Sequence, residues 1–292
     1  MADQHYLFAF FRNNGEDGLY LASSDDGLNW AALNGDRPLV APRVGTERLM
    51  RDPHITLGPD GVFHMVWTTG WNEPTIGYAS SKDLIHWSEQ KAFSPMAHEP
   101  GTRNCWAPES FFDEATGEFV VFWSSTIEGC FPETSGRCED NYNHRIYCTT
   151  TRDFERYSPT RLLYDPGFPV IDATMLKDGG RTLMFVKNET RYPEPAKNIF
   201  MTTSDHALGP YGPASEPVAS DWVEGPSTLW IGDVCHVYFD CYRAKKYGLA
   251  TSTDLISWRD RTDTLHMPGR VSHGCVFAAP QEVADRLRRR AG

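Results

Sequence analysis

The sequence is poor in basic charge, and it has no long apolar run. Its 28 lysines and arginines are outnumbered by 39 aspartates and glutamates, so the formal net charge is −11. Binding to a phosphate backbone needs clustered cations, which this composition does not favour. A span across a bilayer needs about 18 consecutive apolar residues, and none occurs. We therefore expect neutral partners and neither nucleic acid nor a membrane. The oligomeric state is left open.

Targeting and metal-binding patterns are also missing. The first residues lead into a short apolar run without a basic stretch or a cleavage site, which favours an unexported, cytoplasmic protein. The seven cysteines form no CxxC pair and no zinc-ligand spacing with histidine, so we expect free thiols. Cys130 and Cys138 flank a loop and could pair only if the protein were exported. The cysteines are Cys105, Cys130, Cys138, Cys148, Cys235, Cys241 and Cys275.

What the sequence does contain is a repeat of short strands and turns. Each copy reads as a strand, an Asp-bearing turn and an aromatic residue that starts another strand. The copies are 19–30, 76–87, 145–157, 198–211 and 247–258. A second pattern, an acid followed by a short strand, a turn and a strongly apolar strand, starts at Asp52, Glu109, Asp172 and Glu224. Together the two patterns give units of four strands, the size of a propeller blade.

Only four complete units are present, although the first pattern has five copies. The fifth blade must therefore combine both ends of the chain, with 6–11 and 19–22 joining 274–278. This closure removes an open sheet edge. The sequence thus predicts an all-β, five-bladed propeller of four-stranded blades over residues 1–280. Residues 281–292 are predicted to form a basic tail or a short solvated helix.

The four acids are predicted to occupy equivalent positions at the starts of the strands that line the channel. Carboxylates gathered at one mouth raise each other's proton affinity, a cost that structure alone would not select. A paired acid and base is what glycosidic cleavage requires. Trp71, Trp106 and Phe168 are expected near the same mouth, where they could stack on a sugar.

At this point the chain resembles the family 43 glycoside hydrolases, motif by motif and in order. Arg51–Ile55 is similar to the first-blade motif that carries the general base, and Trp106–Glu109 to the second-blade motif, which usually ends in Asp. Ile171–Ala173 and Glu224–Ser227 resemble the third- and fourth-blade motifs. Ser272–Gly274 resembles the fifth-blade His-Gly motif, whose His lies near an axial water or Ca²⁺.

The resemblance implies an inverting mechanism. Asp52 would be the base, Glu224 the acid, and Asp172 the residue that positions Glu224 and keeps it protonated, with about 6.5 to 9.5 Å between acid and base. Arg51, Glu109 and the two tryptophans are expected substrate contacts. Arg270 and His273 are expected at sugar hydroxyls and at the axial water or ion. No cofactor is expected to be required, and the resemblance allows a Ca²⁺ ion on the channel axis near His273.

The family resemblance leaves the sugar open among arabinofuranosides, xylosides and galactosides. A single propeller favours an exo-acting α-L-arabinofuranosidase, and the insertion 126–144 is expected to overhang the site. A phosphorylase using Arg103, Arg145 and Lys187, a β-fructosidase-like enzyme and a carbohydrate-binding propeller without catalysis are the alternatives. The Asp-bearing turn at 23–30 also matches a sialidase motif, but that motif is structural and the sialidase arginine triad is not evident.

Overall fold

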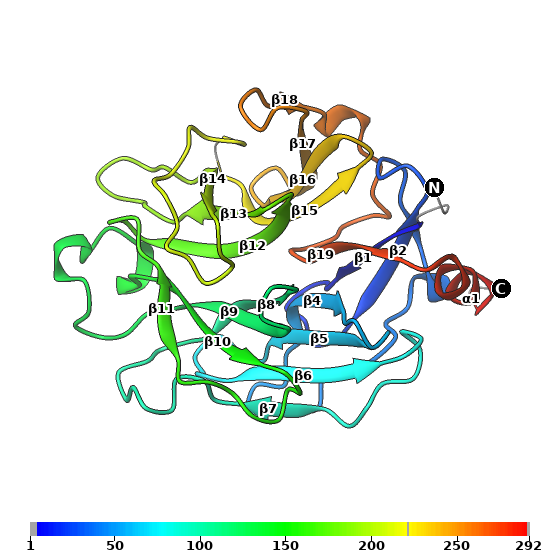
Figure 1. Ribbon diagram of the computed structural model, residues 1–292, viewed down its shortest axis with the longest axis horizontal. Helices are drawn as coiled ribbons and strands as arrows, with labels where there is room; N and C mark the ends of the chain where they lie inside the picture. The colour runs from blue at the N-terminus through cyan, green and yellow to red at the C-terminus, as the bar shows by residue number, and fades with distance from the viewer. Residues whose placement is uncertain (1–4, 221, 291–292) are drawn as a thin grey trace.

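Five antiparallel sheets surround a central axis in the computed structural model, which describes residues 5–220 and 222–290 (Figure 1). The strands that contact one another around that axis are β4 (Arg51–Leu57), β8 (Trp106–Asp113), β12 (Val170–Asp178), β15 (Glu224–Ile231) and β19 (Cys275–Ala279). Each is the innermost strand of one sheet. The prediction of an all-β, five-bladed propeller is confirmed.

The first two blades are built from consecutive strands. In the first, β4 is followed outward by β5 (Phe63–Thr68), β6 (Ile76–Ser81) and β7 (Lys91–Phe93). In the second, β8 is followed by β9 (Glu118–Ser125), β10 (Arg145–Thr151) and β11 (Arg161–Tyr164). Strands β5 and β9 are almost wholly buried, because a blade stacked between two neighbours has no solvent-facing side at its centre.

The third blade departs from the predicted four strands. It contains β12, β13 (Arg181–Asn188) and β14 (Ile199–Ser204), and its outer edge is continued only by an isolated bridge between Ile199 and Ala219. Prolines and glycine are frequent between 209 and 217, and proline has no N–H for a ladder. The fourth blade has all four strands: β15, β16 (Val234–Cys241), β17 (Lys246–Ser252) and β18 (Arg259–Asp260).

Both ends of the chain form the fifth blade, as predicted. Its order is β19, β1 (His5–Phe10), β2 (Tyr20–Ser24) and β3 (Ala31–Ala32), so the C-terminal strand is innermost and pairs with the N-terminal one. Figure 1 shows the red and blue strands side by side where the ring closes. Four short 3-10 helices in the described residues lie in connections: η1 (Asn34–Asp36), η2 (Pro132–Thr134), η3 (Glu139–Asn141) and η4 (Thr262–Thr264).

The final helix, α1 (Gln281–Arg290), is not a fully solvated element. Val283, Ala284 and Leu287 are buried, and Val283 and Leu287 pack into the core between the first and fifth blades. The apolar residues recur at i, i+1 and i+4, the spacing of one helical face. The prediction of a solvated tail is therefore wrong for this face of the helix.

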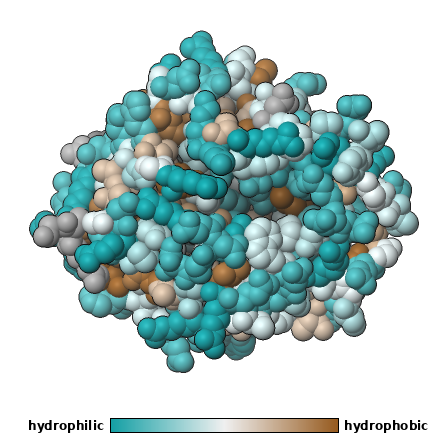
Figure 2. Space-filling model, turned by 180° about the vertical axis from the view of Figure 1, so that it is seen from behind, coloured by the Kyte–Doolittle hydropathy of each residue, from teal (hydrophilic) through white to brown (hydrophobic). Residues whose placement is uncertain are grey.

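One face of the molecule is mostly polar. Figure 2 shows one face on which hydrophilic residues predominate and hydrophobic ones form small separate patches. No helix among the described residues is both long and apolar enough to cross a membrane. All seven cysteines, Cys130 and Cys138 included, have free thiols in the described part of the chain.

A bulge interrupts four of the innermost strands at the same place. On β4 the register moves from Arg51 opposite Thr68 to His54 opposite Val66, which leaves one extra residue on the inner strand. The same shift occurs on β8, β12 and β15. The first residue of each bulge has a positive φ: Asp52 (50°), Ala107 (45°), Asp172 (54°) and Gly225 (59°).

This register corrects the prediction that the four acids are equivalent. Only Asp52 and Asp172 occupy the same bulge position. Glu224 lies one residue before it, at the level of Arg51, and Glu109 lies two residues after it, at the level of His54. Because side chains alternate along a strand and a bulge re-aims them, these offsets decide which acids face the same space.

Candidate active site

A cavity of about 200 Å³ lies where the innermost strands begin. The residues before the bulges, Arg51, Trp106, Ile171 and Glu224, line it together with the bulge acids Asp52 and Asp172. Five further residues complete the lining: Thr68, Trp71, Lys187, Glu189 and His273. The cavity thus gathers four carboxylates and three cationic or ionisable basic groups from different blades.

Asp52 is held as a carboxylate. Thr68 Oγ1 donates a hydrogen bond to its Oδ2 at 2.8 Å, and His273 Nδ1 lies 3.2 Å from its Oδ1. Burial opposes ionisation, but the hydrogen bond and charge of His273 and the charge of Arg51 hold the pKa of Asp52 below its usual value. A backbone at φ 50° is uncommon outside glycine, although aspartate tolerates it better than most residues.

His273 carries the positive charge between the two bulge acids. Its Nδ1 is 3.2 Å from Asp52 and 3.9 Å from Asp172 Oδ2. Burial alone would lower the pKa of His273, yet the charges of Asp172 and Asp52 outweigh it and raise that pKa to about 9. The ring packs against Gly225, where a Cβ would lie 2.4 Å from the imidazole Cγ. Glycine is therefore needed at this bulge both for its positive φ and for the space.

Asp172 lies beside the proposed acid. Its Oδ2 accepts a hydrogen bond from the backbone N–H of Gly225, the neighbour of Glu224, at 3.1 Å. Its own N–H donates to Ser124 Oγ at 3.1 Å, which fixes the bulge to the second blade. Burial raises the pKa of Asp172, and the nearby charges of Glu224 and Asp52 add to that effect against His273 and Lys187. Asp52 and Asp172, equivalent in the repeat, thus have opposite shifts.

Glu224 is anchored by a buried lysine. Lys187 Nζ lies 3.0 Å from Glu224 Oε2 and 2.7 Å from Glu189 Oε2, and it is 2% exposed. Burial would lower the pKa of Lys187, but Glu224 and Glu189 raise it well above its usual value. A second buried lysine, Lys197, contacts the other oxygen of Glu189 at 2.5 Å. Acidic and basic groups thus alternate along this row, so each buried charge lies beside one of opposite sign.

Asp240 is a further carboxyl at the edge of the site. It is the cross-strand partner of Glu224, with β16 beside β15. Burial and the charge of Glu224 raise the pKa of Asp240 to about 7, against His273 and Arg270. Glu224 therefore has Asp172 on one side and Asp240 on the other.

Glu109 lies outside the cavity, deeper in the channel. It is 4% exposed, and burial raises its pKa to about 8. Its Oε2 is 3.3 Å from His54 Nε2. The N–H of Ser110 donates to His54 Nδ1 at 3.2 Å, so the proton of the neutral ring is on Nε2, the nitrogen nearer Glu109. Burial and the charge of His273 lower the pKa of His54 to about 3, so both members of this pair are neutral.

Two of the three predicted aromatic residues lie at the mouth. Trp106 Nε1 donates to the carbonyl of Trp71 at 2.8 Å, and the rings meet edge to face with centroids 5.6 Å apart. The Arg51 guanidinium lies 4.0 Å from the Trp71 ring centroid. From the insertion 126–144, Tyr142 packs on Trp106 with centroids 4.8 Å apart. The insertion therefore borders the site.

Besides Glu109, two predicted contacts lie outside the cavity. Phe168 packs on Phe200, with ring centroids 5.6 Å apart, and lines a different groove beside Tyr211. Phe168 precedes the innermost strand by only two residues, so the sequence suggests a place near the mouth and does not show that the ring turns toward another groove. Arg270 is exposed and outside the cavity, and its carbonyl accepts a hydrogen bond from Arg12.

The cations considered for a phosphate pocket do not converge either. Arg145 is fully buried, with Nε 2.5 Å from Asp165. Arg103 donates to the carbonyls of Asp140 and Asn141. Of the three predicted cations, only Lys187 lines the cavity, and it is already paired with carboxylates.

The chain matches a family model described as "Probable glycosyl hydrolase domain", a model related to glycoside hydrolase family 43, over residues 3–285. The chain belongs to this family. Like the family 43 glycoside hydrolases that its motifs resemble, it has a five-bladed propeller, and carboxylates line the cavity at the starts of its innermost strands.

Known relatives of this family 43-related chain include arabinofuranosidases. An α-L-arabinofuranosidase of Bifidobacterium longum subsp. longum is 24% identical over 245 residues, which cover 75% of this chain and 22% of that protein. The chain thus spans about a fifth of the length of that relative.

Solved structures show the same fold. An α-L-arabinofuranosidase from Lactobacillus brevis superposes with a TM-score of 0.59 at 16% identity, covering 73% of this chain and 72% of that one. An exo-β-1,3-galactanase from Phanerochaete chrysosporium gives 0.58 at 12% identity, covering 76% and 52%.

The axial calcium predicted near His273, held through a water, stays a prediction. Nδ1 of His273 faces the carboxylates of Asp52 and Asp172 at 3.2 and 3.9 Å. Within residues 5–220 and 222–290, no three His, Cys, Asp or Glu side chains converge as a metal site.

Sequence reasoning missed Glu189, Lys197, Thr68 and Asp240. Thr68 ends the apolar strand β5 opposite Arg51, next to Asp52, a position that strand pairing could have identified. Glu189 and Lys197 come from the connection between β13 and β14, where nothing in the repeat marks them. The sequence indicates Lys187 only as a phosphate ligand of the phosphorylase alternative.

Proposed function

We propose that the chain is an inverting, exo-acting α-L-arabinofuranosidase. The observation that carries the proposal is the unequal environment of carboxylates in one cavity. Asp52, with its pKa held low, faces the cavity from the first blade, and Glu224 faces it from the fourth beside Asp172. Two carboxyl groups in unlike environments on opposite sides of one cavity are the usual basis for acid and base roles.

In the proposed reaction, a water attacks the anomeric carbon on the face opposite the leaving group. Asp52 takes one proton from this water as the new C–O bond forms. Glu224, which is paired with Lys187 in the free site, must take up a proton before the reaction. It gives that proton to the glycosidic oxygen as the old C–O bond breaks, so the numbers of atoms and charges balance. Thr68 and His273 orient Asp52, and Lys187 and Asp172 position Glu224.

The size of the cavity supports exo action. At about 200 Å³ it is smaller than the roughly 300–1,000 Å³ of sites for larger ligands, and so fits one sugar ring. Trp71 and Trp106 at the mouth offer a platform for the next unit. The choice of arabinofuranose rests on the named relatives, which include galactan-cleaving enzymes as well as arabinofuranosidases.

A panel of nitrophenyl glycosides tests the substrate, with α-L-arabinofuranoside expected to react fastest. Proton NMR of the first product formed tests the stereochemistry, and the β-anomer is expected. A faster β-D-xyloside or β-D-galactoside would change the sugar, and an initial α-anomer would refute inversion. Added phosphate should leave the product a free sugar; a sugar phosphate would indicate a phosphorylase. No hydrolysis of any glycoside, with binding retained, would indicate a binding propeller.

A further inference from the structure

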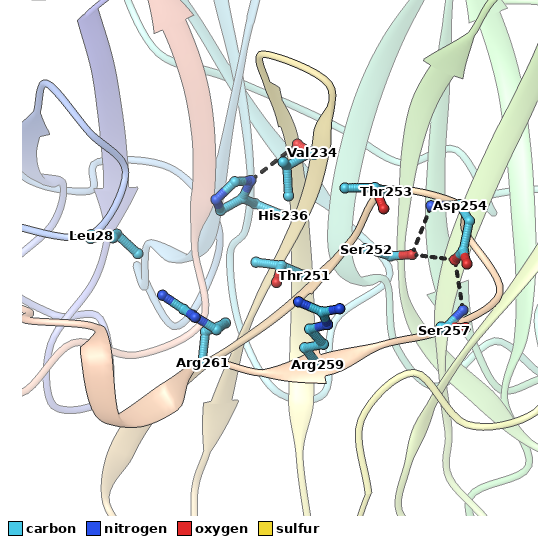
Figure 3. A pocket seen from close by; sticks show the side chains of 10 residues that line it. All are labelled: Leu28, Val234, His236, Thr251, Ser252, Thr253, Asp254, Ser257, Arg259 and Arg261. Carbon is cyan, nitrogen blue, oxygen red and sulfur yellow. Dashed lines mark hydrogen bonds between the residues drawn. The ribbon is translucent and has the colours of Figure 1, made fainter.

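A second cavity, of about 460 Å³, lies at the opposite end of the fourth blade from the active site (Figure 3). On β16 the active-site end is marked by Asp240, the partner of Glu224, whereas Val234 at the other end lines the second cavity. Six residues of strand separate the two, which is about 20 Å. A ligand in this cavity would therefore leave the active site free.

One wall of the cavity is a row of polar side chains across three strands. His236 is paired with Thr251, and Thr251 with Arg259, so the three lie side by side on one face of the sheet. Arg261, two residues after Arg259, lines the same cavity, and Leu28 from the fifth blade lies across it. Figure 3 shows both arginines on the same side as Thr251 and His236.

The two arginines have no acidic partner in the part of the chain that the structure describes: no carboxylate lies within ion-pair distance of either. Asp260, between them, points to the other face and lines a different groove. Asp254 lines the cavity, but its Oδ1 already accepts from the N–H groups of Ile256 and Ser257 and from Ser252 Oγ. This wall therefore presents two guanidinium groups that are free to bind an anion in a chain whose net charge is −11.

His236 adds an acceptor to this cationic wall. Its Nδ1 lies 3.1 Å from the carbonyl of Val234 and must donate to it, which leaves Nε2 with a lone pair. Burial, together with the charge of Arg261, lowers the pKa of His236, so the ring is neutral at pH 7. A neutral imidazole accepts a hydrogen bond from a hydroxyl and offers nothing to a bare anion. The wall thus provides two guanidinium groups that can donate hydrogen bonds to an oxyanion and one imidazole nitrogen that can accept a hydrogen bond from a hydroxyl.

We propose that this cavity is a non-catalytic binding site for an acidic saccharide. Arg259 and Arg261 bind the carboxylate of the saccharide, and His236 Nε2 accepts a hydrogen bond from one of its hydroxyl groups. Thr251 and Thr253 supply further hydroxyl groups, and Leu28 the apolar contact for the sugar face. The site would hold an acidic polysaccharide on the face opposite the active site.

Isothermal titration with trigalacturonic acid at low salt tests the proposal. The double variant Arg259→Gln/Arg261→Gln should weaken binding about tenfold or more, because charged hydrogen bonds are lost. The matched control is Arg156→Gln/Arg181→Gln, which removes the same charge from arginines paired with Asp153 and Asp178 and should bind as wild type does. His236→Phe should weaken binding of the saccharide but not of inorganic phosphate.

Hydrolysis of a nitrophenyl glycoside should be the same in all these variants, so the result does not depend on the proposed activity. A neutral trisaccharide of galactose should bind at least tenfold more weakly than trigalacturonic acid. Equal binding by the two double variants would overturn the proposal. Inorganic phosphate binding as tightly as trigalacturonic acid would overturn the assignment to a saccharide.

Discussion

Glu109→Gln should change how the stability of the protein depends on pH. Glu109 has a pKa raised from 4.5 to about 8 by burial, so the folded state keeps a proton that the unfolded state has lost. Between pH 4.5 and 8 the wild type therefore loses stability as pH rises. At about 1.4 kcal/mol per pH unit, the loss is about 3 kcal/mol at pH 7 and about 5 kcal/mol above pH 8.

Glutamine at this position has the shape of the protonated acid but no proton to lose. Its oxygen can still accept from His54 Nε2. The difference in unfolding free energy, variant minus wild type, should therefore grow in favour of the variant by the amounts above as pH rises from 4.5 to 8. Any constant cost of fitting the amide shifts this curve without changing its slope.

Urea unfolding at four or five pH values measures the difference directly. Glu128→Gln, at an exposed glutamate, controls for the loss of a carboxyl. A flat difference curve for Glu109→Gln would refute the reasoning and show that Glu109 is ionised when folded. Activity at pH 6 should be close to that of wild type, since Glu109 lies outside the cavity. A hundredfold loss would instead make Glu109 a candidate for the base.

Three further predictions concern the cavity. Glu224→Gln should lose about 10² to 10⁴ in turnover on alkyl arabinofuranosides but far less on nitrophenyl ones, which need little protonation, whereas Asp52→Asn should lose as much on both; steady-state rates on the two substrates decide this. Asp172→Asn should lower the pKa of His273 from about 9, because Asp172 is the largest charge raising it, and an NMR titration of the ring would show no change if the contact were unimportant. Gly225→Ala should reduce both the melting temperature and the activity, since its Cβ would lie 2.4 Å from the His273 ring; unchanged values of both would contradict that contact.

The number of blades and the closure of the ring could be predicted because the repeat is carried by local signals. Alternating strands and Asp-bearing turns recur in the same order along the chain. The turns form as expected: Asp83 Oδ1 accepts from the N–H groups of Ile85 and His86, and Asp254 makes the same bonds. These contacts span three residues, so the sequence alone determines them.

The register of the acids could not be predicted from their spacing, because a bulge adds a residue without changing the pattern of apolar positions. Proline was the signal that could have shown it. Pro53, Pro108 and Pro226 each follow the bulge residue with positive φ, at a place where no ladder hydrogen bond is needed. When the motifs are aligned on proline, the residues equivalent to Asp52 are Ala107 and Gly225, not Glu109 and Glu224.

The cations around the acids were harder still to foresee, and they decide what each acid can do. A perfect repeat would give every blade the same acid in the same environment, and so the same proton affinity. Here His273, from the blade that joins the two ends of the chain, faces Asp52 and Asp172, while Lys187 from the third blade holds Glu224. Since the proposed inverting hydrolysis needs one carboxylate that accepts a proton and another carboxyl that gives one, the proposed chemistry depends on the places where the blades differ. The repeat brings the carboxylates together, and the departures from it give them different environments.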